Sequence, residues 1–577
     1  MYKMINNIIF LLAFIFVQDN LRGNNNPLII NVNDMIEFSK LEAYHISQAV
    51  DFAIGQADSI LNLILEIENE KLSYSNFILP IDDLYNFIFR VWGPIDLLLN
   101  VSPNSKIRQE CSDASIDLSN YMIELSLNKL LFNKIYIYSL SDEYNKLENY
   151  QKRFIKNELN DFKKSGLDLS RNKQESIRLI KKEIAAKSIQ FSTNINNYQD
   201  TIYIEEKYMN GLSDNYKNSR SLGQNKYYLD LSYPTYYEYM KNAQSDSIRK
   251  DLYYKFLNIG VPDNIELLNK IIFLRKKYAI ILGYSSYSDM ILSDNMAKNT
   301  KKVFDFEDDL MRNAVEKSKI DLNNLLLIKN RITGKVDSII HPWEKYYYET
   351  KLLKINYDLD IENIKEYFLL ENVLSGLFKI TQHLFEIKYI LINNASTWHN
   401  DIKCYEVRNS SNNALIGIFY LDLYPRKNKY NHAAEFTIYG GKLLNSTYQI
   451  PVAALVCNFN KSTKDVPSLL SHDEVETLFH EFGHVLHDIL TTVKLSSQSG
   501  TSVLIDFVEA PSQMLEKWVW TKDALQIFAK HYKTNKVIPD SLLFSMLEAK
   551  NYQSGNNLLQ QIFYGMLDLK LHHNFDP

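Results

Sequence analysis

Apolar positions recur with a helical period over most of the chain, from about Glu37 to Lys388. In the stretch ESIRLIKKEIAAKSIQFSTNI, Ile177, Ile180 and Ile184 are separated by three and four residues, with charged side chains between them. One face of an α-helix repeats at this spacing. Glycine is scarce, at 17 residues, and no Pro/Gly/Ser-rich linker interrupts the pattern. The pattern therefore predicts a large helix-rich body without a clean domain boundary.

Between Asp401 and Asn460 the pattern changes to short runs that alternate apolar and polar residues. The runs IKCYEVRN and LIGIFYLDLYP flank the turn-forming SSNNA, which predicts a β-hairpin. The apolar run IPVAALVCNFN, which starts at Ile450, predicts a further strand. A small sheet is therefore expected beside the segment that follows, with an edge that would suit an extended peptide.

The next segment, SHDEVETLFHEFGHVLHDIL, begins with the signature of a helix start. The side-chain oxygen of Ser471 can accept the backbone N–H of Glu474 while that glutamate reaches back, which is a capping box. At about 100° per residue, three histidines fall in a narrow arc: His480, His484 and His487. The apolar residues fall in the opposite arc: Val475, Leu478, Phe479, Phe482, Val485, Leu486, Ile489 and Leu490.

His480, Glu481 and His484 form the pattern H-E-x-x-H, which is typical of a helical zinc site with a built-in base. A catalytic zinc takes three protein ligands and keeps a fourth position for water. The longer pattern with a third histidine is excluded, because His487 and Leu490 occupy the positions of its glycine and histidine. A downstream carboxylate is the other solution, and spacing alone leaves three candidates open: Asp506, Glu509 and Glu516. Competing interpretations of the histidine arc are a solvent-facing patch and a structural metal site.

Charge and cysteine content exclude other classes of protein. The chain of 577 residues has 64 Lys+Arg and 69 Asp+Glu, and this net charge of -5 leaves no basic surplus for nucleic acid. Its three cysteines, Cys111, Cys404 and Cys457, are widely separated, so neither a disulfide framework nor a cysteine-rich zinc site is predicted. We expect them to be buried as small apolar residues.

The N-terminus carries the apolar run IIFLLAFIFV, from Ile8 to Val17. This run has about the length of a signal-peptide core and is shorter than the ~20 residues of a membrane span. The following QDNLRG lacks a small-x-small cleavage pattern, so export, an interfacial anchor and the buried start of a helix remain open. The location of the protein, cytoplasmic or exported, is therefore left open. No other run is apolar enough for a stable membrane span.

Several long motifs resemble one family. HDEVETLFHEFGHVLH and SGTSVLIDFVEAPSQMLEKWVW, together with WHNDIKCYEV, IGIFYLDLYPR and PVAALVCNFN, closely resemble the thimet oligopeptidase and neurolysin family of zinc peptidases. The resemblance implies a mainly α, two-lobed metallopeptidase with a deep central channel and a small sheet beside the H-E-x-x-H helix. We accordingly expect an apolar segment 1–26, helical lobes that form the channel wall in 27–400, and a catalytic region in 401–577.

The resemblance also implies the site. It implies one Zn²⁺ per chain, with His480, His484 and Glu509 as ligands and Glu481 as general base. Such an ion would lower the pKa of a bound water and polarise a scissile carbonyl. His487 matches a histidine of the family motif and is a candidate for contact with substrate or with a ligand. Asp506 lies one helical turn before Glu509 and is a candidate to hydrogen-bond a ligand histidine.

Members of this family continue past the equivalent of LDLKLHHNFDP with a segment that carries donors for the oxyanion, and this segment is expected to be missing. Losing one such donor can cost about a hundredfold to a thousandfold in rate. The predicted function is a zinc-dependent metalloendopeptidase that hydrolyses short unstructured peptides. The alternatives are a catalytically weak or inactive zinc- or peptide-binding remnant, a fragment, and a split enzyme that needs a second polypeptide.

Overall fold

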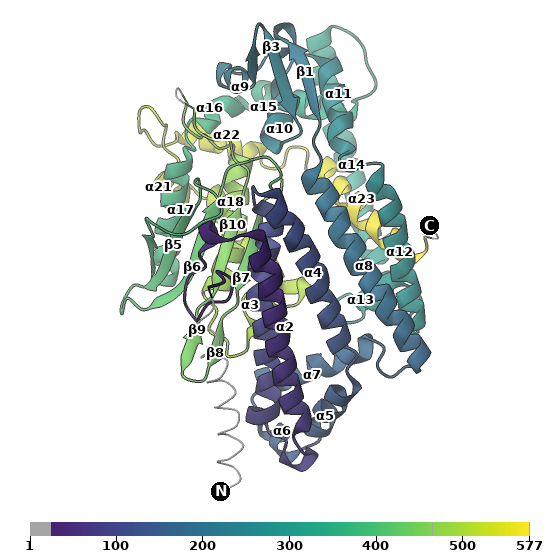
Figure 1. Ribbon diagram of the computed structural model, residues 1–577. Coiled ribbons are helices and arrows are strands. Elements are labelled where there is room, and N and C mark those ends of the chain that lie inside the picture. The colour runs from purple at the N-terminus through teal and green to yellow at the C-terminus, as the bar shows by residue number, and fades with distance from the viewer. Residues whose placement is uncertain (1–24, 464–465, 576–577) are drawn as a thin grey trace.

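The computed structural model describes residues 25–463 and 466–575, and α-helices form most of it (Figure 1). The sheet and the H-E-x-x-H helix lie on one side, and long helices form the other side, so the expected mainly α fold is confirmed. Within the described residues, no helix combines the length and the apolar character that crossing a membrane requires. The predicted segment 1–26 lies almost wholly outside the described residues.

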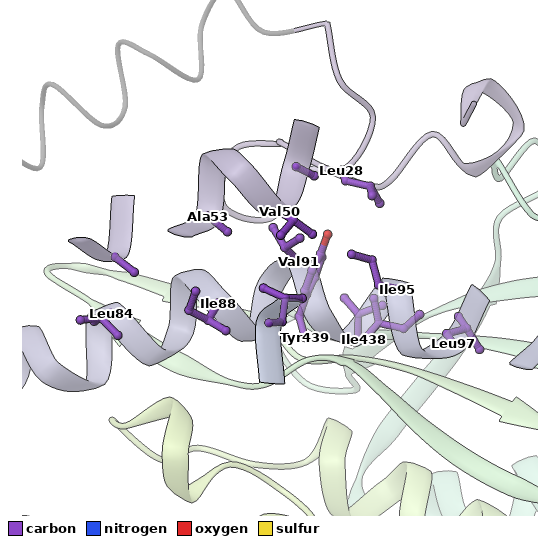
Figure 2. Packing of buried hydrophobic residues seen from close by; sticks show 14 of the residues in the cluster. Leu28, Val50, Ala53, Leu84, Ile88, Val91, Ile95, Leu97, Ile438 and Tyr439 are labelled. Atoms are coloured by element: carbon purple, nitrogen blue, oxygen red, sulfur yellow. The ribbon is translucent and has the colours of Figure 1, made fainter. Parts of the chain in front are cut away.

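The N-terminal part is a layer of antiparallel helices that packs against the side of the molecule with the main sheet. Leu84, Ile88 and Val91 of its central helix α3 meet residues of α2 and the strand residue Ile438 in one buried cluster (Figure 2). Since this cluster joins the predicted regions 27–400 and 401–577, their cores are continuous. The helices are α2 (Ala43–Glu66), α3 (Leu79–Val101), α4 (Ser105–Leu125), α5 (Lys129–Ser139), α6 (Asp142–Lys146), α7 (Asn149–Lys164) and α8 (Arg171–Asn197).

A small sheet interrupts the block in which the sequence predicts only helices. Its strands β1 (Thr201–Glu205), β2 (Ser221–Gly223) and β3 (Lys226–Asp230) are antiparallel in the order β1-β3-β2. The turn before β3 places Gln224 and Asn225 at positive φ. TIYIE and KYYLD alternate over only five residues, so the helical period around them hides these strands.

Helices continue on both sides of this sheet, and the last of them shares a buried core with the H-E-x-x-H helix. The long α14 runs beside the C-terminal α23 on the side opposite the main sheet (Figure 1). The helices are α9 (Asp214–Ser219), α10 (Tyr233–Asn242), α11 (Asp246–Leu257), α12 (Asp263–Ile281), α13 (Tyr287–Leu292), α14 (Thr300–Thr333), α15 (Lys345–Tyr357), α16 (Ile361–Lys365) and α17 (Leu370–Phe385).

The main sheet has five strands in the order β4-β5-β6-β10-β7. The predicted hairpin is confirmed as β5 (Lys403–Asn409) and β6 (Leu415–Asp422), and the predicted further strand is β10 (Val452–Val456). β4 (Ile387–Leu391) lies before residue 400, so the sheet begins inside the region predicted to be helical. The last strand, β7 (Ala434–Tyr439), pairs with β10 alone and forms one edge of the sheet, where α3 packs against the backbone of Thr437 and Ile438. The hairpin β8 (Lys442–Leu444) and β9 (Thr447–Gln449) follows it.

The chain after the main sheet is helical and carries the candidate site. Helix α18 (His472–Ile489) packs against β10 and β7, and α20 (Ala510–Glu516) packs against α18. The three cysteines are buried and free, as expected. The other helices are α19 (Ile505–Val508), α21 (Lys522–Phe528), α22 (Asp540–Ala549) and α23 (Ser554–His573).

Candidate metal centre

Helix α18 starts where the sequence predicts. The Ser471 hydroxyl accepts the backbone N–H of Glu474 at 3.2 Å, and the Glu474 carboxylate accepts the backbone N–H of Ser471 at 2.7 Å. The predicted apolar face is buried, apart from Leu490, which is half-buried beyond the helix end. The opposite arc keeps His480 and His484 partly exposed. The capping box and the face together fix the direction in which the histidines point.

His480, His484 and Glu509 come together on the exposed side of α18. One carboxylate oxygen of Glu509 lies 3.2 Å from Nε2 of His480 and 3.2 Å from Nε2 of His484. The three donor atoms lie within 4.8 Å of one another, and among the described residues this is the only such group of histidine, cysteine and acidic side chains. Two imidazole nitrogens and one carboxylate oxygen are a donor set that suits Zn²⁺.

Glu509 reaches the histidines from a break between two helices. It ends α19 and begins α20, and its side chain is 51% exposed. A 3-10 turn, Ser496–Gln498, and the short α19 precede it in the chain. Glu509 lies at the junction of the two helices, and from there its carboxylate faces the two Nε2 atoms.

The carboxylate that holds a ligand histidine is Glu516, not Asp506. Oε1 of Glu516 lies 2.6 Å from Nδ1 of His480, which leaves Nε2 of that ring facing Glu509. Asp506 is exposed and accepts the backbone N–H of Met296 at 3.0 Å instead. Among the described residues, Asp506 thus makes no hydrogen bond to His480 or His484, and its candidate role stays a prediction. Glu516 lies seven residues after Glu509, two helical turns on, and the sequence offered it only as a possible third ligand.

Glu481 lies between the histidine pair and the edge strand β7. The backbone N–H of Glu435 on β7 hydrogen-bonds its carboxylate. Burial raises the pKa of Glu481 above its ordinary value; the charge of His480 opposes this rise, and the charge of Glu509 adds to it. A carboxylate with a raised pKa is a stronger base, so Glu481 has the environment of a general base near neutral pH.

The remaining histidines of the arc are neutral at neutral pH. Burial lowers the pKa of His484 and the pKa of His487. A neutral imidazole is the form that binds a metal. The His487 ring centre lies 6.2 Å from that of Phe507, and its Nδ1 is buried without a hydrogen-bond partner among the described residues. His487 thus lies one turn beyond the ligand pair, at the edge of the site.

Two cavities lie near the open edge of the main sheet. One, of about 710 Å³, lies between α3 and α4 and the end of β7, where Thr437 and Ile438 line it. The other, of about 960 Å³, lies behind the loop 425–431 that precedes β7 and reaches α10 and α16. Neither cavity is lined by His480, Glu481, His484 or Glu509. A single continuous channel through them stays a prediction.

A mainly helical fold with an H-E-x-x-H helix and a glutamate beside it defines the class of metalloendopeptidases. The model of peptidase family M3 matches residues 239–577, and the model of the neurolysin/thimet oligopeptidase N-terminal domain matches residues 57–174. The chain belongs to peptidase family M3.

Curated relatives agree with this family, and a solved structure shares the fold. The chain is 34% identical to saccharolysin of Saccharomyces cerevisiae, over 87% of the chain and 74% of that protein. It is 31% identical to oligopeptidase A of Haemophilus influenzae, over 96% and 83%. A solved structure described as oligoendopeptidase F from Bacillus anthracis shares the fold, with a TM-score of 0.52 and 12% identity over 94% of this chain and 80% of that one. These comparisons give no support to the alternative of a split enzyme with a second polypeptide.

Proposed function

We propose that this protein is a zinc-dependent endopeptidase of short unstructured peptides, with one Zn²⁺ bound by His480, His484 and Glu509. The observation that supports it most is the approach of one Glu509 oxygen to within 3.2 Å of both Nε2 atoms, with Glu481 beside them. When bound, the ion supplies a positive charge that polarises a water molecule and the scissile carbonyl. The protein residues supply the base and hold the peptide.

Glu481 is proposed as the general base. Its carboxylate takes a proton from the attacking water and gives that proton to the leaving amine, so the carboxylate is restored at the end of each turnover. Because burial raises its pKa, Glu481 is protonated at acidic pH and becomes the active base as the pH rises. Hydrolysis is therefore expected to increase with pH on the acidic side of its optimum.

The open edge of β7 is proposed to hold the peptide backbone. β7 is the last strand of the five-stranded sheet, and its residue Glu435 is already bonded to Glu481 through the backbone N–H. An extended peptide that added to this edge would lie along the site, with main-chain hydrogen bonds independent of its sequence. A folded protein cannot present such a strand, which agrees with short unstructured substrates.

The test combines metal content and hydrolysis on the same purified protein. Zinc is measured by atomic spectroscopy and cleavage by an internally quenched short peptide, with Glu481→Gln as the control variant. We expect close to one zinc per chain in both proteins and cleavage in the unmodified protein only, because the neutral amide of the variant cannot accept the proton. Zinc without cleavage in the unmodified protein would support a zinc-binding remnant, and protein without zinc would refute the metal site.

A further inference from the structure

Asp488 is a buried carboxylate in the last turn of α18, outside the proposed ligand set. Its side chain is among the most buried polar groups, at 1% exposure. Oδ1 accepts the backbone N–H of Thr501 at 2.7 Å and the hydroxyl of Thr501 at 3.0 Å. Oδ2 accepts the hydroxyl of Thr437 on β7. One side chain thus connects α18, the open edge strand and the segment that leads to Glu509.

The chain passes Asp488 so closely at Gly500 that a larger residue would not fit. Gly500 has φ +50°, and a Cβ atom added there would lie 1.9 Å from Oδ1 of Asp488 and 2.6 Å from its Cα. Both the backbone conformation and the contact therefore require glycine. Asp488 therefore fixes the position at which the segment from Gly500 to Glu509 begins.

A second carboxyl group, that of Glu435, completes the arrangement. Glu435 and Thr437 are two apart on β7, so their side chains share a face of the strand and both reach Asp488. Burial, and then the charge of Asp488, raises the pKa of Glu435 well above its ordinary value. The raised pKa favours the protonated form of Glu435, which can donate a hydrogen bond to the Asp488 carboxylate.

We propose that Asp488 is a positioning residue that fixes Glu509 and the edge strand β7 relative to the histidines of α18, with Glu435 as its hydrogen-bond donor. Asp488 acts through Thr501 and Gly500 on the segment that carries Glu509, and through Thr437 and Glu435 on β7. Neither acid touches the ligand set directly. This inference rests on the proposed function, because the readout is the affinity of the site for zinc.

The first experiment compares Asp488→Asn with a matched control, Asp321→Asn. Asp321 is 2% exposed, lies on α14 away from the site, and likewise accepts a backbone N–H from a distant segment, that of Gly555 at 2.9 Å. Both variants lose one buried charge that accepts hydrogen bonds, and Asp321→Asn also breaks an ion pair with Lys317, so its fall in thermal stability is expected to be at least as large as that of Asp488→Asn. Only Asp488→Asn is expected to weaken zinc affinity, by about 10- to 100-fold in a chelator competition, as is typical of residues that orient ligands.

Hydrogen exchange of the apoprotein gives a readout that needs no metal. In Asp488→Asn the amides of residues 499–509 are expected to exchange faster than in the unmodified protein, while those of α18 keep their protection. Equal zinc affinity and equal exchange in a folded Asp488→Asn protein would overturn the inference. Should the unmodified protein bind no zinc, the proposed function fails, and the exchange data still decide whether Asp488 positions the segment.

The second experiment tests the protonation state of Glu435. Glu435→Ala removes the donor and is expected to weaken zinc affinity in the same direction as Asp488→Asn. Glu435→Gln replaces the acid by a neutral amide that still donates a hydrogen bond, so it is expected to restore the affinity to within about threefold of the unmodified protein. If Glu435→Gln retains zinc and yet loses hydrolysis as completely as Glu481→Gln, Glu435 acts as an ionised group, and its assignment as a neutral donor is wrong.

Discussion

At the residue scale, the two histidines of the site differ in what holds their rings. Nδ1 of His480 lies 2.6 Å from the Glu516 carboxylate, so this ring is fixed by a charged partner. Nδ1 of His484 is buried, and no partner for it occurs among the described residues. A ligand histidine that donates its second N–H to a carboxylate is oriented and made a better donor. The orientation of His480 therefore depends on Glu516.

We predict that Glu516→Gln weakens zinc affinity about 10- to 100-fold. The amide keeps the size of the side chain but carries no negative charge, so it holds the imidazole less firmly. Asp506→Asn is the matched control, because Asp506 is a nearby carboxylate that bonds the backbone of Met296 rather than a histidine. Chelator competition measures the zinc affinity of both variants. A larger loss of affinity in Asp506→Asn than in Glu516→Gln would show that Asp506, and not Glu516, orients the histidine.

At the element scale, the site depends on how closely α18 and α20 approach. Gly483 lies on α18 between the two ligand histidines, and a Cβ atom there would lie 2.5 Å from Cα of Ser512 and 3.0 Å from the carbonyl oxygen of Pro511. Backbone atoms cannot give way as a flexible side chain can. The absence of a side chain at residue 483 thus lets α20 bring Glu509 and Glu516 to the histidines.

We predict that Gly483→Ala lowers the free energy of unfolding by about 1–3 kcal/mol, the usual cost of overpacking, and lowers zinc content. Gly55→Ala is the control, because Gly55 lies within α2 and a Cβ there meets no atom within 4 Å. That variant is expected to gain about 0.5–1 kcal/mol from the helix preference of alanine. Urea unfolding and metal analysis measure both effects, and full zinc content with unchanged stability in Gly483→Ala would contradict this account of the contact.

The elements that the sequence predicts well are those with a strong local signal. The capping box at Ser471 and the apolar face of α18 identify that helix, and alternation around SSNNA identifies the β5–β6 hairpin. The roles of Glu516 and Asp488 could not be predicted, because both depend on segments far apart in the sequence that meet only in the fold. Glu509 was predicted as the third ligand from its resemblance to a family motif, because spacing alone left three candidate carboxylates.

At the scale of the whole molecule, a buried ion pair connects the N-terminal helices to the catalytic side. Lys442 of β8 is fully buried, pairs with Asp82 of α3 and lies 2.9 Å from Asp83. Asp82 also accepts the backbone N–H groups of Ser496 at 2.9 Å and Ser497 at 3.0 Å. These serines begin the segment that passes Asp488 and ends at Glu509. The N-terminal helices therefore support the segment that carries the third proposed ligand.

We predict that Lys442→Met destabilises the protein by about 3–5 kcal/mol, because it leaves the Asp82 charge buried and unpaired. Lys40→Met, which breaks an exposed pair with Glu37, is expected to cost less than about 1 kcal/mol. Adding Asp82→Asn to Lys442→Met removes the charge of Asp82 and keeps an acceptor for one of the two serine amides, which bond different oxygens of Asp82, so it should recover part of the loss. Urea unfolding of the four proteins measures these differences. If the double variant is less stable than Lys442→Met, Asp82 stabilises the fold through the serine amides rather than through Lys442.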